Sequence, residues 1–321
     1  MNYRSLGATG IKVSAVGYGC WGIGGNAGGA VAYGPTRDED SIQALERALE
    51  LGVNFFDTAD LYGYGHSEEL LGRVLAPRRE RVVIATKVGL IEGGRGYDFS
   101  RKHILETLTA SLRRLRSDYI DLYQLHNPSL ETLDGRDSPL GVMEELLAQG
   151  KIRAFGVSLR SPEDGLAVVG HFPVGCVQVN FNLTDQRAVE QGLFKLCAEK
   201  NVGVIVRSPL VAGFLTGRYT GTKSFGEFDQ RRSWSAEQIR RWNQAEDFFA
   251  VIMARYPEDT PAQFALRFCL SFPGVSAAIP GMLTAAHVEE NVVAGGYCGL
   301  AEEDIALLFQ KYKSVEFFVK G

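Results

Sequence analysis

The sequence predicts an α/β fold, a (β/α)8 TIM barrel with an N-terminal β-hairpin and a C-terminal helix. Eight short apolar runs alternate with amphipathic stretches along the 321 residues. The runs are almost continuously apolar, as expected for parallel strands that are buried on both faces. Polar and reactive residues follow most of the runs, and a closed parallel barrel brings all of these strand ends to one rim.

The first segment, YRSLGATGIKVS, has two short extended pieces around Gly7-Ala8-Thr9-Gly10 and predicts a small β-hairpin. The expected parallel strands follow in order, at Ala15–Gly19, Asn54–Asp57, Val82–Thr86, Ile120–Gln124, Ala154–Val157, Cys176–Val179, Val204–Val206 and Ser276–Ile279.

Helical periodicity fills the gaps between these strands. The clearest helices are expected at Ser41–Leu51, Ser100–Leu115, Leu140–Leu147, Gln191–Lys200 and, at the end, Leu300–Phe318. No linker separates the units, so we expect one domain over residues 1–321. An open doubly wound sheet is the alternative, but GYGCWGIGG leads into a long loop and not directly into a helix, unlike the glycine fingerprint of such folds.

Composition excludes several classes of protein. The net charge is −4 with both signs interspersed, which argues against nucleic-acid or anionic-membrane partners. The N-terminus lacks an apolar core of signal-peptide length, and no apolar run is long enough to span a bilayer. The five cysteines are scattered and never form a CxxC pair, which argues against disulfides or a structural metal and favours a reducing cytoplasm.

Four polar side chains near consecutive strand ends form a candidate proton-transfer group: Asp57, Tyr62, Lys87 and His126. The pKa of a free tyrosine, about 10, is too high for easy proton transfer at neutral pH. A nearby lysine ammonium lowers it, and an aspartate keeps that lysine charged. A histidine can donate a hydrogen bond to a substrate carbonyl. Such a group protonates a developing alkoxide and therefore needs a hydride donor from a cofactor.

The motifs FFDTADLYG, VIATKVG, LYQLHNP, FGVS, VQVNFNL, RSPLVAGFLTGRY and IPG followed by EN resemble the aldo-keto reductases in order and spacing. The resemblance runs along nearly the whole chain. It implies a barrel that binds NADP(H) or NAD(H) across its rim, with no metal, and reduces a carbonyl to an alcohol. In this resemblance Tyr62 is the general acid/base, Lys87 and Asp57 tune it, and His126 orients the carbonyl.

The resemblance also implies cofactor contacts. Ser158 and Gln178 match the residues that hydrogen-bond the nicotinamide carboxamide, and Ser208, Leu210 and Gly213 match the loop along the pyrophosphate. Further contacts are expected at Gly281 and, for the adenine, at Asn291 together with Glu290. Thr284 and His287 are the candidates for the 2′-phosphate. The run from Met282 to His287 has no fixed positive charge, so preference for NADPH or NADH stays open.

Two residues depart from the family pattern. Leu159 stands where asparagine is usual, so one carboxamide contact is either lost or made by another group. Arg207 stands where an aromatic residue usually stacks on the nicotinamide. A guanidinium can stack as well, and it can instead pair with a phosphate or a substrate anion. A cation at this place disfavours the oxidised, positively charged ring and favours reduction.

Substrate determinants are fewer. Trp21 follows the first strand, where the family lines its pocket with an aromatic residue; other wall candidates are Tyr64, Tyr97, Arg160 and Phe228. The long polar stretch Thr216–Ser235 is interpreted as a functional lid or a disordered surface loop.

We expect a reductase of small aldehydes or ketones, with a sugar or secondary-metabolite carbonyl as examples. The alternative is a cofactor-binding sensor or auxiliary subunit, as in the β subunits of potassium channels. The oligomeric state is open.

Overall fold

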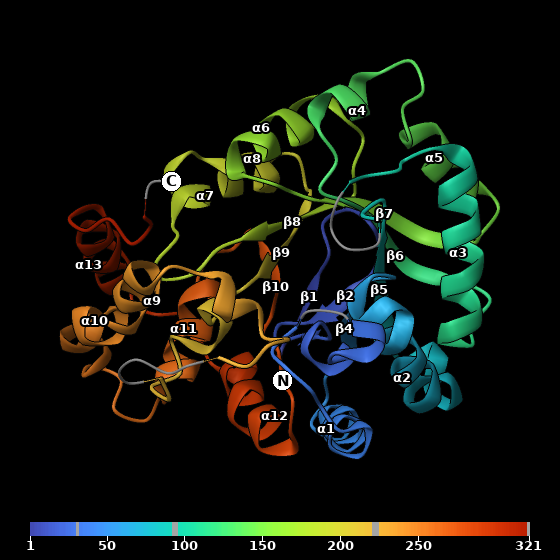
Figure 1. Cartoon of the computed structure of the whole chain (residues 1–321). Coiled ribbons are helices and arrows are strands. Elements are labelled where there is room, and N and C mark those ends of the chain that lie inside the picture. The colour runs from blue at the N-terminus through green and yellow to red at the C-terminus, as the bar shows by residue number, and fades with distance from the viewer. Residues whose placement is uncertain (30–31, 92–95, 220–224, 320–321) are drawn as a thin grey trace.

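The computed structural model describes residues 1–29, 32–91, 96–219 and 225–319. Its centre is one sheet of eight strands in the order β10-β9-β8-β7-β6-β5-β4-β3, all neighbours parallel (Figure 1). The strands are β3 Tyr18–Gly19, β4 Phe55–Asp57, β5 Val83–Val88, β6 Ile120–His126, β7 Ile152–Ser158, β8 Cys176–Asn180, β9 Gly203–Arg207 and β10 Val275–Ile279.

The two edges of this sheet meet. Parallel bridges join Val16 to Ala278 and Gly19 to Gly281, so the segment of β3 lies beside β10 and the barrel closes. Gly19 is required here because a Cβ at this position would lie 2.7 Å from the carbonyl oxygen of Ile279. The predicted (β/α)8 barrel is confirmed, and each of the eight strands lies where its apolar run predicts.

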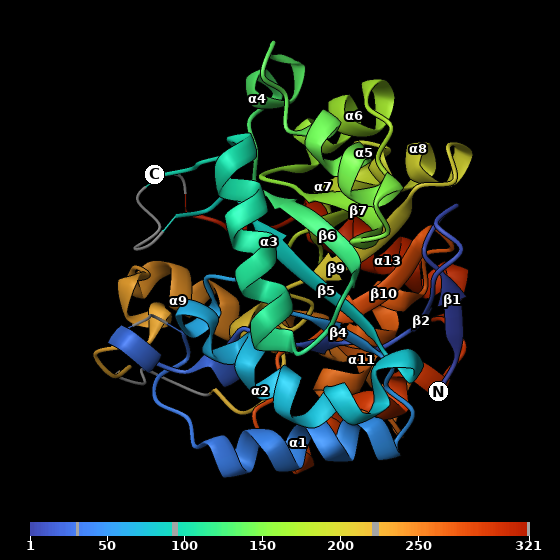
Figure 2. The same ribbon diagram turned by 90° about the vertical axis from the view of Figure 1, so that its right-hand side faces the viewer.

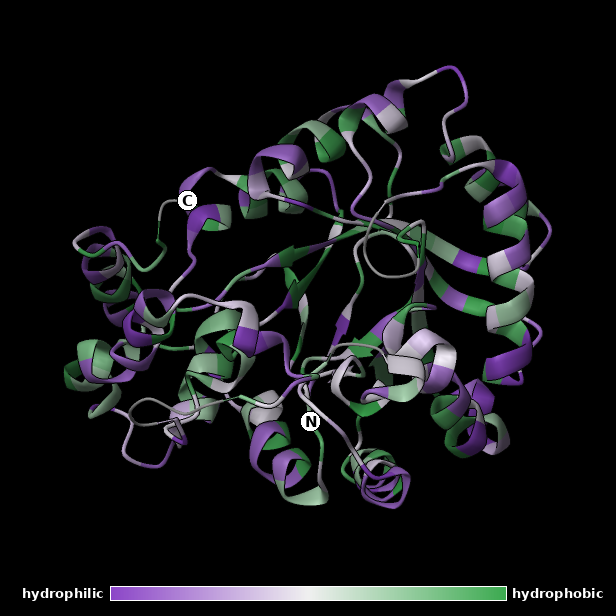
Figure 3. Ribbon diagram, viewed as in Figure 1, coloured by the Kyte–Doolittle hydropathy of each residue, from purple (hydrophilic) through white to green (hydrophobic). Residues whose placement is uncertain are grey.

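Helices surround the barrel. They are α1 Asp38–Glu50, α2 His66–Leu75, α3 Arg101–Leu115, α4 Leu130–Asp134, α5 Leu140–Ala148, α6 Pro162–His171, α7 Arg187–Glu190, α8 Leu193–Glu199, α9 Ala236–Asn243, α10 Ala245–Met253, α11 Pro261–Leu270, α12 Ala285–Val292 and α13 Glu302–Lys313. Figure 2 shows α3 crossing in front of β5 and β6, with α2 below it and α1 at the bottom of the view. In Figure 3 hydrophobic and hydrophilic residues interchange along these helices, as amphipathic helices require.

Local sequence explains where several helices begin. Ser100 accepts a hydrogen bond from the backbone N–H of His103 at the start of α3. Thr260 and Gln263 form a reciprocal capping box at the start of α11, and Pro261 occupies the first turn, where its missing N–H costs nothing. Three acidic residues lie in the first turn of α1, where they face the positive end of the helix dipole.

The predicted hairpin closes the bottom of the barrel. Strands β1 Tyr3–Ser5 and β2 Lys12–Ser14 pair antiparallel. Leu6, Ile11 and Val13 pack against inward-facing residues of the barrel strands and form one buried cluster with them. This cluster is the lower layer of the barrel interior, and it leaves the opposite rim free for polar residues.

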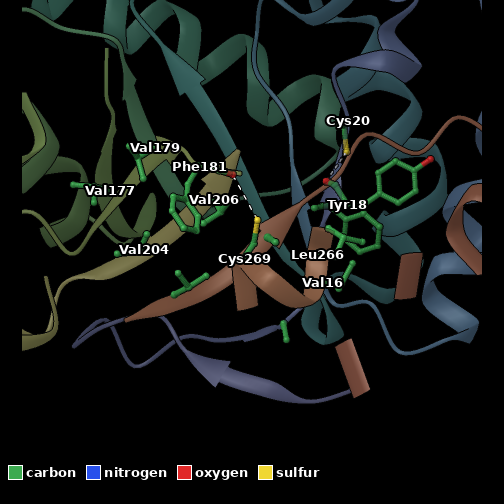
Figure 4. Close-up of a cluster of buried hydrophobic side chains, with 14 of the residues drawn as sticks. Val16, Tyr18, Cys20, Val177, Val179, Phe181, Val204, Val206, Leu266 and Cys269 are labelled. Carbon is green, nitrogen blue, oxygen red and sulfur yellow. Dashed lines mark hydrogen bonds between the residues drawn. The ribbon is translucent and has the colours of Figure 1, made fainter. Parts of the chain in front are cut away.

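A second, larger cluster fills the space between strands and helices. Figure 4 shows part of it, in which valines of β8 and β9 lie near Phe181 and the α11 residues Leu266 and Cys269. The thiol of Cys269 lies 3.6 Å from the carbonyl oxygen of Phe181. Strand residues thus alternate between the two clusters, one facing the barrel axis and the other the helices.

Helix boundaries differ from the prediction by a few residues. Helix α1 begins at Asp38 and not at Ser41, because the acidic residues before Ser41 join its first turn. The segment predicted from Gln191 contains a left-handed Gly192, which separates α7 from α8. The last helix ends at Lys313, although Phe317 beyond it is still buried. Within the described residues, no helix combines the length and apolar character needed to cross a bilayer.

Candidate active site

The site arises from the two-residue period of the strands. Phe55, Ala85 and Ile205 face the lower apolar layer of the barrel. Two residues further along the same strands stand Asp57, Lys87 and Arg207. The same step leads from Leu122 to Gln124 and then His126, from Ala154 to Gly156 and then Ser158, and from Cys176 to Gln178. A layer of polar side chains therefore lies above the apolar one, at the carboxyl ends of the strands.

Asp57, Lys87 and Tyr62 are joined directly. The Lys87 ammonium donates to Asp57 Oδ1 at 2.6 Å, to the carbonyl oxygen of Thr58 at 2.8 Å and to the Tyr62 hydroxyl at 3.3 Å. Lys87 and Asp57 are buried, at 0% and 2% exposure. Three acceptors around one ammonium satisfy its three N–H groups, so a buried lysine stays charged at this place.

Two glutamines hold the other oxygen of Asp57. Gln124 Nε2 and Gln178 Nε2 donate to Asp57 Oδ2 at 3.0 and 2.8 Å. Gln124 was not predicted, although its place two residues before His126 on a strand puts both on one face. Gln178 was expected to bond the nicotinamide carboxamide. Its amide nitrogen is committed to Asp57, which leaves its oxygen for such a contact.

Burial and charge act in opposite directions on the two proton-bearing groups. Burial raises the pKa of Tyr62, and Lys87 lowers it by a smaller amount, so the pKa lies above its ordinary value. The expectation of a lowered pKa is therefore not met, because desolvation outweighs the charge of the ammonium. Burial lowers the pKa of Lys87, but the charge of Asp57 and the contact with Tyr62 overcome it and the pKa is raised.

His126 is a buried neutral imidazole beside the tyrosine. The two rings meet edge to face with centroids 6.4 Å apart. Burial, followed by the charges of Lys87 and Arg207, lowers the pKa of His126 to about 3. Its Nδ1 is buried and has no hydrogen-bond partner among the described residues. A neutral histidine can donate one hydrogen bond, from whichever nitrogen carries the proton.

A cavity of about 790 Å³ opens above these residues, within the size range of small-molecule sites. Predicted site residues make up much of its wall: Trp21, Asp57, Tyr62, His126, Ser158, Gln178, Arg207, Ser208, Leu210, Gly213, Gly281, His287 and Asn291. Lys87 lies behind this wall, and Thr284 lies outside it. Of the other proposed wall residues only Tyr64 lines the cavity; Tyr97, Arg160 and Phe228 do not.

The loop after β9 has a backbone that suits a close approach by an anion. Ser208, Val211, Ala212 and Gly213 all have positive φ, between 49° and 96°. Such a conformation is costly for a β-branched residue like Val211, and strain of this kind gathers at binding sites. Successive residues with positive and negative φ also turn their N–H groups towards a common centre. This fits the predicted pyrophosphate contact.

Ser158 and Leu159 lie at the end of β7. Asn127, from the end of β6, has positive φ, and its backbone N–H donates to the carbonyl oxygen of Ser158 at 2.9 Å. With its amide turned, Asn127 Nδ2 also donates to the carbonyl oxygens of Ser158 and Leu159, both at 3.2 Å. Leu159 itself is buried in the outer core at 2% exposure, so it offers no polar contact.

The far end of the cavity holds a cation that sequence reasoning missed. Arg218 lines the cavity with His287, Glu290 and Asn291, and it pairs with Glu290 at 2.5 Å. Thr284 instead caps α12, where its hydroxyl accepts from the backbone N–H of His287 at 3.3 Å. Arg218 stands in the quoted motif LTGRY, about 70 residues from the segment that was searched for a positive charge.

The segment Thr216–Ser235 contributes to this cavity, although residues 220–224 lie outside the described part. The backbone N–H of Gln230 donates to the carbonyl oxygen of Ala32 at 2.8 Å, which ties the segment to the loop after β3. Arg231 pairs with Asp229 at 2.7 Å, and its guanidinium lies 5.1 Å from the ring centre of Tyr33. Tyr33 in turn packs edge to face on Trp21. Gln230 and Arg231 of this segment thus pack against the loop after β3 at the rim.

The chain is similar to known proteins over most of its length. The model of the Aldo/keto reductase family matches residues 15–313. The chain is 32% identical over 313 residues to the uncharacterized oxidoreductase YqkF of Bacillus subtilis (strain 168), which covers 96% of this chain and 95% of that protein. It is 33% identical over 290 residues to aldo-keto reductase yakc of Schizosaccharomyces pombe, whose name gives NADP(+) as cofactor, with 87% and 83% coverage.

Among solved structures, the holo form of aldo-keto reductase AKR11C1 from Bacillus halodurans is similar in fold. It superposes with a TM-score of 0.78 at 29% sequence identity, and the match covers 97% of this chain and 96% of that one.

Proposed function

The chain belongs to the aldo/keto reductase family, and on that premise we propose that it reduces a small aldehyde or ketone to an alcohol with Tyr62 as the proton donor. It is an oxidoreductase that uses NAD(P)H. The observation that carries the proposal is the chain of contacts from Asp57 through Lys87 to the Tyr62 hydroxyl, which faces the cavity.

Of Asp57, Lys87 and Tyr62, Tyr62 is the one that combines a transferable proton with a place on the cavity wall. A bound reduced nicotinamide supplies the hydride for the carbonyl carbon. As charge develops on the carbonyl oxygen, the Tyr62 hydroxyl gives it a proton, and the ammonium of Lys87 at 3.3 Å stabilises the phenolate left behind. The raised pKa of Tyr62 keeps the hydroxyl protonated at neutral pH, ready for this transfer.

His126 fixes the direction of the carbonyl. Its pKa of about 3 keeps the ring neutral at physiological pH, so it acts as a hydrogen-bond donor to the carbonyl oxygen and not as a second acid. Tyr62 and His126 both line the cavity, and two donors fix one oxygen between them. Ser158 and Gln178, the proposed carboxamide contacts, line the same cavity.

The residues present fit a dinucleotide. The oxygen of Gln178 and the hydroxyl of Ser158 would hold the carboxamide, and the backbone of residues 208–213 would hold the pyrophosphate. Asn291, at 4% exposure, would contact the adenine. We propose that NADPH is preferred over NADH, because Arg218 supplies at the adenine end the positive charge that residues 282–287 lack.

The substrate is proposed to be an aldehyde or ketone whose body is an aromatic ring, a sugar or a secondary-metabolite skeleton. Trp21, Tyr64 and Trp234 line the cavity with flat apolar surfaces that suit such bodies.

The reductase proposal is tested by NADPH consumption at 340 nm with a panel of aldehydes and ketones. Aldehyde-dependent NADPH consumption is expected. If a folded protein that binds NADPH consumes none with any member of the panel, the reductase proposal is contradicted and the sensor or auxiliary role remains.

The cofactor proposal is tested with Arg218→Met. NADPH binding, followed by tryptophan fluorescence, is expected to weaken roughly tenfold or more while NADH binding stays within about twofold. Arg232→Met, a change at an exposed arginine outside the cavity, is the matched control.

A further inference from the structure

Arg207 is a charged residue at the carboxyl end of β9, on the wall of the cavity. It is the last residue of β9, and the alternation of that strand turns it to the barrel axis, two positions after the buried Ile205. It lines the cavity together with Tyr62 and His126. A second cation besides Lys87 therefore stands next to the proposed proton donor.

The guanidinium lacks a carboxylate partner in the described part of the chain. Within the described residues the guanidinium donates one hydrogen bond, from Nη2 to the carbonyl oxygen of Leu159 at 3.2 Å. Its Nε is buried and has no partner among the described residues. Burial lowers the pKa of Arg207, but an arginine remains protonated in proteins. A buried charge without a counter-ion is unfavourable, and proteins normally pair such groups.

The nearest carboxylates are already engaged elsewhere. Asp57 takes Lys87 on one oxygen and two glutamines on the other. Asp185 receives two bonds from Arg187, both at 2.8 Å, and one from Asn180 at 2.6 Å. Neither lies within 4.0 Å of Arg207. The N–H groups of the Arg207 guanidinium are therefore available to hydrogen-bond a molecule bound in the cavity.

We propose that Arg207 is an anion-binding residue of this cavity, taking a carboxylate or phosphate oxygen of a bound molecule. Guanidinium groups match both anions with two parallel hydrogen bonds. Two sources carry this chemistry: a carbonyl substrate with a carboxylate, which rests on the proposed function, or a phosphate of the cofactor, whose loop begins at Ser208. The neighbourhood of Tyr62 and His126 favours the substrate as the source.

Two probes of similar shape, one charged and one neutral, separate the effect of the probe's negative charge from the effect of its shape. Benzoate and benzamide are titrated into the NADP(+) complex and into the ligand-free protein by calorimetry, with no turnover involved. Wild type is expected to bind benzoate roughly tenfold or more tightly than benzamide. Arg207→Met is expected to abolish that preference. Arg207→Lys, which keeps the charge but not the fork, should keep part of it. Arg160→Met is the matched control, because Arg160 is an exposed arginine outside the cavity wall.

The outcomes of these titrations distinguish a substrate carboxylate from a cofactor phosphate as the bound anion. A benzoate preference that persists in the NADP(+) complex assigns the anion to the substrate. A preference lost in that complex, together with weaker binding of both NADPH and NADH by Arg207→Met, assigns it to a cofactor phosphate. Equal binding of the two probes by wild type, with unchanged cofactor affinities in folded Arg207→Met, overturns the proposal. Failure of the reductase proposal would instead appear as a lack of aldehyde-dependent NADPH consumption, which leaves these titrations unaffected.

Discussion

Replacing Lys87 with methionine separates the catalytic role of the ammonium from its structural role. Methionine has a similar length but no charge. The ammonium lies 3.3 Å from the Tyr62 oxygen. At an effective dielectric constant of about 20, a full charge on that oxygen at this distance is worth about 5 kcal/mol, an upper limit because water also stabilises a phenolate. The net value of one charge-assisted hydrogen bond is about 1.5–3 kcal/mol.

Losing about 1.5–3 kcal/mol of transition-state stabilisation lowers kcat roughly 10- to 150-fold. We therefore expect Lys87→Met to reduce aldehydes that much more slowly, with the affinity for NADPH unchanged within about threefold. The assay is steady-state NADPH consumption at saturating aldehyde, with cofactor binding measured by tryptophan fluorescence. A folded variant with the wild-type kcat would refute the role of the ammonium.

The free energy of unfolding supplies the control for the Lys87→Met variant. Removing one partner of a buried ion pair costs about 3–5 kcal/mol, because the other charge is left without compensation. Lys87→Met leaves Asp57 buried with only Gln124 and Gln178 as donors. The double variant Asp57→Asn, Lys87→Met removes that charge as well. We expect it to regain much of the free energy of unfolding while its kcat stays low. Recovery of kcat together with stability would mean that Lys87 acts only through the fold.

Two further predictions concern pH and the barrel bottom. Burial, followed by the charge of Glu68, raises the pKa of Asp60 to about 7. The native state then holds this proton between pH 4 and 7 where the unfolded chain releases it, so the stabilisation is full at low pH and is lost as the pH rises towards 7. We expect Asp60→Asn to have a higher Tm than wild type at pH 8 and to lose most of that advantage at pH 5; parallel Tm curves would contradict this. Leu6, at 0% exposure, belongs to the lower layer of the barrel. Leu6→Ala is expected to cost about 2–5 kcal/mol in a denaturant titration. The kcat of the folded variant should be unchanged, and a large fall in kcat without a loss of stability would contradict the separation of the two layers.

Much of this architecture could be predicted because the signals are local. The eight strands are continuous apolar runs, and their order follows from a parallel barrel, so Asp57, Lys87 and His126 could be assigned to one rim. Gln124 was missed although the same alternation points it inward; its signal was available in the spacing to His126.

Other features depend on distances that a sequence does not contain. Arg218 reaches Glu290 across 72 positions, so a search limited to the residues after IPG could not find this cation. Whether the pKa of Tyr62 is raised or lowered depends on the balance between its burial and its distance from the charge of Lys87. A sequence contains neither quantity. Thr284 was taken for a phosphate contact, but its hydroxyl caps α12, a common role for threonine just before a helix.

Tyr62→Phe is the decisive variant, because it removes one oxygen and leaves the ring in place. NADPH binding is followed by quenching of tryptophan fluorescence, and reduction by single-turnover absorbance at 340 nm with a saturating aldehyde. Loss of a general acid lowers such a rate by roughly 10²- to 10⁴-fold, and we expect this loss with the NADPH affinity unchanged within about threefold. Reduction by Tyr62→Phe at the wild-type rate would show that the proton comes from another group and would contradict the mechanism.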